Sequence, residues 1–307
     1  MPLLGVFARL HQELPDRRLL LVLAGSSRDG AADVVRARVD ALGLGAHVRI
    51  DVDPHAPQLL MSAADVFVSP ADSIQEAFGL TPVEAMAAGI PQVVARWNGY
   101  AETVVDGETG FLIPTVWADC ADDLVLEAPL LSREWLDHLA LGQSVAVDLD
   151  VLHLRLRQLV LDPALRHRMG EASRRRAVER YAASTIAAAY EALWTELGAQ
   201  ADQDRQPPRT SLAYSDPPFW RAFGHYASRT LADTDQVTLT GTPAPSPHAS
   251  VIDAALADAV VATLGGSPDL SVGALVSAVA ATTDASVPKI RRHVLWLLKS
   301  GALALRA

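Results

Sequence analysis

Lysine is almost absent from this sequence of 307 residues. Of its 26 basic residues, only Lys289 and Lys299 are lysines, and the others are arginines. Residues 1–288 therefore contain no ammonium side chain for catalysis or for binding an anion. Any positively charged side chain in that part of the sequence is an arginine or a protonated histidine.

Cysteine and long apolar runs are also scarce. The single cysteine, Cys120, excludes an internal disulfide framework. The longest purely apolar run, residues 19–24, has the length of a strand and falls far short of the roughly 18 residues of a membrane span. The N-terminus lacks a basic region followed by a long apolar core, so we expect no secretory signal and a cytoplasmic location.

The chain has no excess of positive charge. The net charge of -10 argues against nucleic acid as the main partner of the whole chain. Hydrophobic residues make up 50% and charged residues 20%, which is typical of a folded protein and excludes a disordered one. The length leaves room for two domains.

The first two-thirds of the sequence alternate short apolar runs with helical patterns. This alternation is typical of a parallel sheet covered by helices, so we predict an α/β domain with a Rossmann-like sheet over residues 1–200. The expected strands are 19–24, 47–52, 65–69, 91–95 and 110–114. The expected helices include 31–42, 58–64, 151–161 and 164–197.

The composition changes near residue 201. Seven of the 19 prolines lie between Pro207 and Pro247, which predicts a proline-rich connector over residues 201–250. Aromatic residues at 218–226 indicate that part of this connector packs on a domain. Residues 251–307 contain three helical patterns and a terminal strand, and we predict a small helical, winged-helix-like domain there.

The most informative stretch begins after the strand that ends at Ser69. We expect a helix there with Thr81 as N-cap and Pro82 at its first position, and Glu84 would complete a capping box with Thr81. Since this strand ends at the carboxyl edge of the sheet, the helix start lies where open α/β folds bind ligands.

The backbone at this helix start is suited to an anion. Its N–H groups, from about Phe78 to Thr81, surround the positive end of the helix, and Gly79 allows a ligand to approach closely. A diphosphate is the anion that such a turn fits best.

Glu76 and Glu84 lie in the sequence Glu-Ala-Phe-Gly-Leu-Thr-Pro-Val-Glu-Ala-Met-Ala-Ala-Gly-Ile-Pro. This stretch resembles the donor-site motif of family 4 retaining glycosyltransferases, which have the two-domain GT-B fold. The resemblance covers roughly residues 1–200 and extends to 97–100, Glu102, 106–107, 109–114 and 190–194. It implies that residues 1–200 are the C-terminal, donor-binding half of such an enzyme.

The resemblance assigns a role to each residue of this stretch. Glu76 would act at the catalytic centre by binding hydroxyls of the transferred sugar, and Glu84 would hold the ribose of the nucleotide. Sugar and phosphate would face the backbone N–H groups of Phe78, Gly79 and Leu80. The sequence also allows two structural alternatives: Glu84 could serve only the capping box, and Glu76 could be a solvated loop carboxylate.

The loop that begins at Gly25, after the first strand, is a further candidate for contact with the nucleotide. An ordinary strand-to-helix turn would explain the same residues. No Gly-Lys-Ser or Gly-Lys-Thr follows, so the loop is not a P-loop.

Parts of the family's usual machinery are not expected in this chain. The family has an N-terminal acceptor-binding domain, followed by a loop whose arginine and lysine bind the diphosphate. Residues 1–10 resemble the helix after that loop, so we expect both the acceptor domain and the loop to be missing. Residues 1–288 offer no replacement lysine, and we do not expect the chain alone to transfer sugar.

The resemblance implies a hexosyltransferase that uses a nucleotide-sugar donor and an acceptor hydroxyl, with retention and without a metal or other cofactor. One alternative is a non-catalytic nucleotide-sugar-binding or regulatory half that needs a partner, such as a separate acceptor-binding domain. Another is DNA or protein binding through residues 251–307, whose last helix carries Lys289, Arg291, Arg292, His293 and Lys299. A segment charge of only about +1 makes nucleic acid the weaker of these partners.

Overall fold

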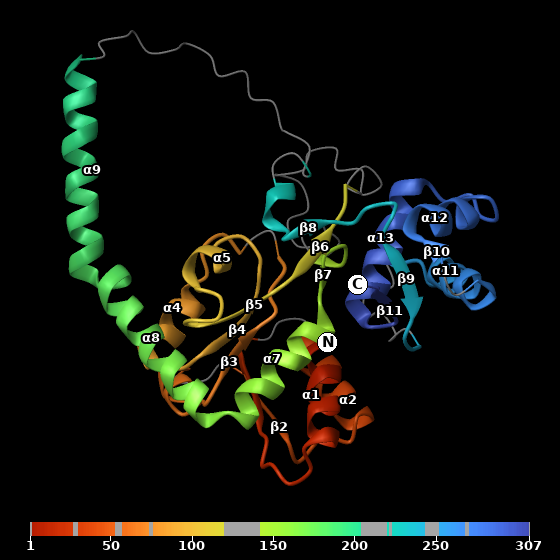
Figure 1. Ribbon diagram of the computed structural model, residues 1–307, viewed down its shortest axis with the longest axis horizontal. Helices are drawn as coiled ribbons and strands as arrows, with labels where there is room; N and C mark the ends of the chain where they lie inside the picture. Colours follow the sequence, from red (N-terminus) through yellow and green to blue (C-terminus); the bar gives the residue numbers. More distant parts are fainter. Residues whose placement is uncertain are drawn as a thin grey trace.

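The computed structural model describes residues 2–26, 30–52, 57–73, 76–119, 142–203, 220, 223–242, 252–267 and 270–306. Helices and strands alternate through the first part of the chain, and a second group of helices follows near the C-terminus (Figure 1). No helix among these residues is long and apolar enough to span a membrane.

Two parallel sheets form the centre of the first part of the chain. One has the strand order β1-β2 and the other β3-β4-β5. The strands are β1 (Leu21–Gly25), β2 (Val48–Val52), β3 (Phe67–Ser69), β4 (Gln92–Ala95) and β5 (Gly110–Ile113). The helices around them are α1 (Pro2–Glu13), α2 (Ala31–Ala41), α3 (Pro57–Ser62), α4 (Leu80–Ala88) and α5 (Tyr100–Thr103). This alternation confirms the predicted parallel α/β class.

Strands β4 and β5 are buried along their whole length. A parallel strand with helices on both of its faces needs apolar side chains on both, which explains the consecutive buried residues Val93, Val94 and Ala95. This buried centre fixes the carboxyl ends of β3 and β4, and with them the two loops that follow.

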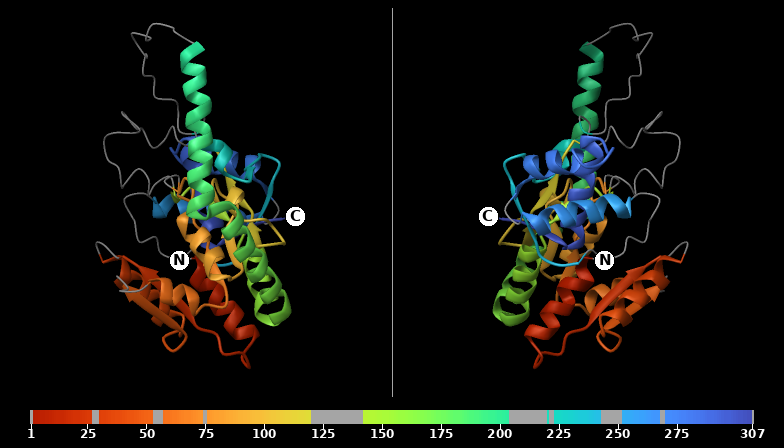
Figure 2. Two further views of the ribbon diagram at one scale, coloured as in Figure 1. Left: turned by 90° about the vertical axis from the view of Figure 1, so that its left-hand side faces the viewer. Right: turned by 90° about the vertical axis from the view of Figure 1, so that its right-hand side faces the viewer.

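Three helices continue the chain after residues 120–141: α7 (Leu149–Leu161), α8 (Pro163–Tyr181) and α9 (Ala183–Gln203). Asp148 and Asp162 are the N-caps of α7 and α8. The prediction of one helix over residues 164–197 is wrong, because the backbone is extended at Ala182, with φ -62° and ψ 141°. After this break α9 runs away from the rest of the molecule, and residues 183–201 are exposed (Figures 1 and 2).

Helix α8 packs closely on α4. Gly170 of α8 lies against the backbone of Gly89, the residue that ends α4 with φ 75°. Two arginines of α8 also donate hydrogen bonds to backbone carbonyls in the last turns of α4 and α5. Arg174 donates to the Ala87 oxygen of α4, and Arg176 donates to the Thr103 oxygen of α5 at 2.8 Å. Such carbonyls lack intrahelical donors, so these arginines stabilise the domain from within.

Residues in the predicted connector pack on the first part of the chain. The short strand β8 (Arg229–Thr230) pairs in parallel with β6 (Thr115–Trp117), which also pairs with β7 (Ala146–Val147). The Trp220 ring meets that of Trp117 at 5.1 Å, and Tyr226 of the 3-10 helix η2 (Gly224–Tyr226) meets Trp97 at 5.6 Å. The expected packing of the aromatic residues is therefore observed.

In the described part of the C-terminal unit, three helices pack with a three-stranded antiparallel sheet. Its helices are α11 (Ala254–Gly266), α12 (Val272–Ala280) and α13 (Val287–Ser300). Its sheet has the order β10-β9-β11, with β9 (Gln236–Leu239), β10 (Leu270–Ser271) and β11 (Leu303–Leu305). The three helices and terminal strand follow the expected order. The central strand β9, however, precedes the first helix and lies in the predicted connector, so the winged-helix likeness is not confirmed.

The two parts of the protein share one hydrophobic core. Buried side chains of α13, such as Leu295 and Trp296, belong to the same cluster as Trp97, Trp117 and Ile113 of the first part. The C-terminal unit therefore lies against the end of the sheet at which β5 passes into β6, as Figure 1 shows.

Candidate functional site

The start of α4 differs from the prediction. Gly79 is the N-cap, with φ 79° and ψ 87°, and no side chain caps the helix. The predicted N-cap at Thr81 and the capping box with Glu84 are therefore wrong, because the third helical position is Pro82 rather than a glutamate. Glycine adopts this positive φ without strain, which lets the helix begin earlier than expected.

The uncapped start of α4 offers backbone donors. The first four positions of a helix have no intrahelical acceptor for their N–H groups. Here they are Gly79, Leu80, Thr81 and Pro82, and proline has no N–H. The N–H groups of Gly79, Leu80 and Thr81 therefore lie at the positive end of the helix dipole, where an anion binds favourably.

Gly79 packs directly on Tyr100, the first residue of α5. A Cβ atom at position 79 would overlap the Tyr100 ring, which is itself only 1% exposed. Gly99 makes a similar close approach, since a Cβ atom there would collide with the backbone of Ala77 and Phe78. The loop before α4 is thus pressed against the segment that follows β4.

Glu76 is held by that same segment through its side chain and its backbone. The Tyr100 hydroxyl donates to Glu76 Oε2 at 3.3 Å, and Asn98 Nδ2 donates to the Glu76 carbonyl oxygen at 2.9 Å. Trp97 Nε1 donates to the carbonyl oxygen of Ser73 at 2.8 Å. Glu76 is half-buried and oriented, which argues against a merely solvated loop carboxylate.

The Tyr100 hydroxyl stays protonated and can therefore donate a hydrogen bond to Glu76. Burial raises the pKa of Tyr100, and the neighbouring Glu76 carboxylate raises it further. Hydrogen bonds with Ser69 and Thr81 act in the opposite direction without reversing the shift. The phenol is therefore protonated at neutral pH, and it bridges Ser69, at 3.0 Å, and Glu76.

The other predicted residues of the motif lie on the outer side of the helix start. Leu80, Thr81 and Glu84 are exposed, and Glu84 lies one turn after Leu80 on the same face of α4. Phe78 is 44% exposed, and its ring meets that of Tyr181 edge-on at 6.0 Å. Since the capping box is absent, Glu84 has no capping role in the structure.

Gly25 is the one predicted site residue that lies in another sheet. It ends β1, which pairs only with β2 among the described strands, whereas the loop with Glu76 follows β3. Gly25 is exposed, with a φ of 157°. Its part in ligand binding stays a prediction.

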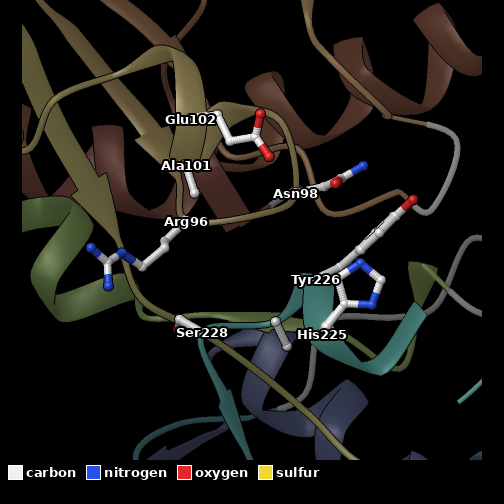
Figure 3. A pocket seen from close by; sticks show the side chains of 8 residues that line it. Arg96, Asn98, Ala101, Glu102, His225, Tyr226 and Ser228 are labelled. Carbon is white, nitrogen blue, oxygen red and sulfur yellow. The ribbon is translucent and has the colours of Figure 1, made fainter. Parts of the chain in front are cut away.

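A pocket of about 320 Å³ opens beside the Glu76 loop (Figure 3). Its walls come from the segment after β4 and from connector residues that are distant in sequence. Glu102 lies on one side and His225 and Tyr226 on the other, with Asn98 between them (Figure 3). The same Asn98 amide donates to the Glu76 backbone, so the pocket and the candidate site are neighbours.

Trp97, Asn98 and Tyr100 position the site in the structure, although they were not among the predicted site residues. They follow β4, which is the neighbour of β3 in a parallel sheet, so their loop lies at the same edge as the Glu76 loop. Their position directly after β4 was the feature of the sequence that could have identified them as site residues. Among the described residues, no group of three histidine, cysteine, aspartate or glutamate side chains could hold a metal ion.

Residues 2–128 match the family described as glycosyl transferases group 1. A D-inositol 3-phosphate glycosyltransferase of Corynebacterium diphtheriae is 39% identical over 137 residues, which cover 41% of this chain and 31% of that protein. A phosphatidyl-myo-inositol mannosyltransferase of Mycobacterium tuberculosis is 35% identical over 114 residues, covering 36% of this chain and 28% of that protein. The chain thus spans about a third of the length of these curated relatives.

Solved structures resemble the chain more distantly. A sucrose-phosphate synthase from Thermosynechococcus elongatus aligns with a TM-score of 0.46 and 26% identity, over 64% of this chain and 42% of that chain. The C-terminal domain of a glycosyl transferase group 1 family protein from Francisella tularensis aligns with a TM-score of 0.42 and 17% identity. That alignment covers 59% of this chain and 77% of the solved domain.

Proposed function

Since residues 2–128 match the glycosyl transferases group 1 family, we propose that the chain binds a nucleotide sugar at the start of α4. It serves as the donor-binding part of a retaining hexosyltransferase. The observation that carries this proposal is the uncapped, glycine-led start of α4 beside a glutamate that Tyr100 and Asn98 hold in place.

Each part of the ligand has a matching group at this site. The N–H groups of Gly79, Leu80 and Thr81 bind the diphosphate, because they combine free donors with the positive end of a helix. Glu84, one turn along the exposed face of α4, accepts hydrogen bonds from the ribose hydroxyls. Glu76 accepts hydrogen bonds from hydroxyls of the sugar. A carboxylate accepts two such bonds at once, and charge-assisted bonds are roughly twice as strong as neutral ones.

Transfer breaks the bond between the sugar and the diphosphate, so negative charge grows on the departing diphosphate. Oriented donors that stabilise such charge are each worth roughly 10²–10³ in rate. The start of α4 supplies donors of this kind without a metal, but residues 1–288 supply no lysine. We therefore expect efficient transfer to need an additional acceptor-binding part that brings further positive charge.

A non-catalytic nucleotide-sugar-binding module is the second candidate, and the lack of lysine in residues 1–288 favours it. The two candidates differ in one assay. Addition of a separately expressed acceptor-binding domain yields a glycosylated acceptor only if this chain is the donor half of an enzyme. A binding module would leave both donor and acceptor unchanged.

DNA binding through the C-terminal unit has little support in the structure. Three of the basic residues on α13 form ion pairs within the protein: Lys289 with Asp253, Arg291 with Asp233 and Lys299 with Asp72. His293, on the same helix, is buried. Cations already paired with carboxylates form a weak electrostatic footprint for nucleic acid.

The direct test of the proposal is ligand binding by the full chain. Calorimetry and thermal-shift measurements with UDP, GDP and ADP, and with their sugar conjugates, should identify one nucleotide that binds and raises the unfolding temperature. Absence of heat and of any shift with all of them at millimolar concentration contradicts the proposal.

A further inference from the structure

The C-terminal unit reaches the loop that carries Glu76. Lys299, in the last turn of α13, forms an ion pair with Asp72, three residues after the end of β3. The partners are 227 positions apart in the sequence, and their side chains are only 15% and 16% exposed. By contrast, the side chains of the Arg9 and Asp150 pair are 54% and 74% exposed.

The burial of this pair makes both partners interdependent. An exposed ion pair can separate at little cost, because water solvates each charge. Water cannot solvate a buried charge in this way, so loss of one partner leaves the charge of the other uncompensated. Asp72 is therefore held where α13 places the Lys299 ammonium group.

Asp72 belongs to a set of three contacts that hold the described residues on either side of positions 74 and 75. The neighbouring Ser73 carbonyl oxygen accepts from Trp97 Nε1 at 2.8 Å, and the Glu76 carbonyl oxygen accepts from Asn98 Nδ2 at 2.9 Å. Those two contacts come from the segment after β4, whereas the ion pair comes from the C-terminal unit. One of the three contacts beside the candidate site thus comes from a helix outside the α/β domain.

Helix α13 is a rigid support for this contact. Eight of its residues are buried, and Trp296 and Leu298 belong to the core shared with Trp97. The ammonium group at position 299 also lies in the last turn, where the helix dipole favours a cation. Motion of α13 relative to the sheet would therefore disturb core packing as well as the ion pair.

Lys299 also removes an electrostatic obstacle. Without it, Asp72 would add an uncompensated negative charge to the loop that leads to the proposed diphosphate site. Such charges repel an anionic ligand over distances up to the Debye length, about 8 Å at physiological salt. The pair with Lys299 neutralises this carboxylate while using it as an anchor.

We infer that Lys299 is a positioning residue through which the C-terminal unit sets the loop of Asp72 and Glu76 for nucleotide-sugar binding. The restraint on the loop stands on the structure alone, and its consequence for the ligand rests on the proposed function. The C-terminal unit is in this sense part of the donor site.

The test is hydrogen exchange of the full chain, measured by mass spectrometry on peptides that cover residues 70–80. Lys299→Met should accelerate exchange there by about three- to thirtyfold, a range typical of coupling between structural elements. Lys299→Arg should retain slow exchange, since it keeps the cation. Asp72→Asn breaks the same pair from the other side and should also accelerate exchange.

Lys289→Met is the matched control. It also removes a lysine of α13 from an ion pair, but its partner Asp253 is the N-cap of α11 within the C-terminal unit. This variant should leave exchange at residues 70–80 unchanged. Unchanged exchange in Lys299→Met, or equal acceleration over the whole chain in both lysine variants, would overturn the inference.

UDP titrations complete the test. Lys299→Met should weaken UDP binding by a similar factor, and the Asp72→Asn/Lys299→Met double variant should recover part of the affinity because the bare carboxylate is gone. Unchanged UDP affinity in Lys299→Met would overturn the link to the ligand. If the unaltered chain binds no UDP, the proposed function fails for this nucleotide, whereas the exchange experiment still decides the restraint on the loop.

Discussion

Tyr100 donates a hydrogen bond to Glu76 Oε2, and its ring fills the space that a side chain at position 79 would need. One buried tyrosine therefore sets both parts of the candidate site. Its hydroxyl orients the carboxylate assigned to the sugar, and its ring supports the turn assigned to the diphosphate.

Tyr100→Phe should separate these two contributions. The ring that supports Gly79 stays, whereas the hydrogen bonds of the hydroxyl with Ser69, Thr81 and Glu76 are lost. Stability should fall by about 0.5–1.5 kcal/mol, the usual worth of a hydrogen bond. In calorimetry the affinity for the sugar conjugate should fall and that for the free nucleotide should stay nearly constant. Equal loss of both affinities would show that Tyr100 does not act through Glu76.

Gly79→Ala should destabilise the protein by about 1–3 kcal/mol, because alanine is strained at a positive φ and its Cβ would collide with Tyr100. Gly107→Ala is the control. Its φ of 76° is similar, but no atom lies within 4 Å of the added Cβ, so only the backbone strain remains. Denaturant unfolding should rank Gly79→Ala as clearly less stable. Equal losses would mean that the contact with Tyr100 adds nothing.

His293 should make stability depend on pH. Burial lowers its pKa from the usual 6.5. The charges of Arg292 and Lys289 act in the same direction, and they outweigh, together with burial, the opposite effects of the Lys289 backbone hydrogen bond and the Asp253 carboxylate. Its Nε2 accepts from the Asp253 backbone N–H at 2.9 Å, which requires that nitrogen to be unprotonated. The unfolded chain therefore binds a proton more readily below pH 6.5 than the folded protein does. The free energy of unfolding should be constant above that pH and fall as the pH decreases through it.

Urea unfolding at pH 7.5, 6.5 and 5.5 measures this effect. Burial also lowers the pKa of His153, so both histidines contribute in the same direction, each by at most about 1.4 kcal/mol per pH unit. His293→Gln should reduce the slope between pH 6.5 and 5.5. The lowered pKa of Asp253 does not interfere, because that carboxyl titrates below its usual 3.8. An undiminished slope in this variant would rule out His293 as the source.

The sequence was sufficient to predict the parallel α/β class and the placement of residues 76–84 after β3. Periodic apolar runs located the strands to within a few residues, because buried parallel strands such as β4 and β5 must be apolar on both faces. The candidate site itself was predicted from this position and from the resemblance of residues 76–91 to the donor-site motif. The start of α4 was predicted wrongly because Thr81, Pro82 and Glu84 fit a capping box, whereas Gly79 begins the helix earlier.

Long-range contacts could not be predicted from the sequence. Nothing in the pattern around Lys299 indicates a partner 227 positions away, since such a pair depends on how α13 packs against the sheet. The same holds for β9, which joins the C-terminal sheet from within a segment rich in proline. The break at Ala182 was missed because its neighbours on both sides have helical patterns.

The division of labour between Glu76 and Glu84 is the central claim, and it is tested most directly by calorimetric titration of Glu76→Gln and Glu84→Gln with a free nucleotide and with its sugar conjugate. Glu84 is exposed and caps no helix, so stability should be unchanged in that variant while the affinity for both ligands falls. Glu76→Gln should bind the free nucleotide normally and lose affinity only for the sugar conjugate. Equal losses for both ligands in both variants would contradict the account.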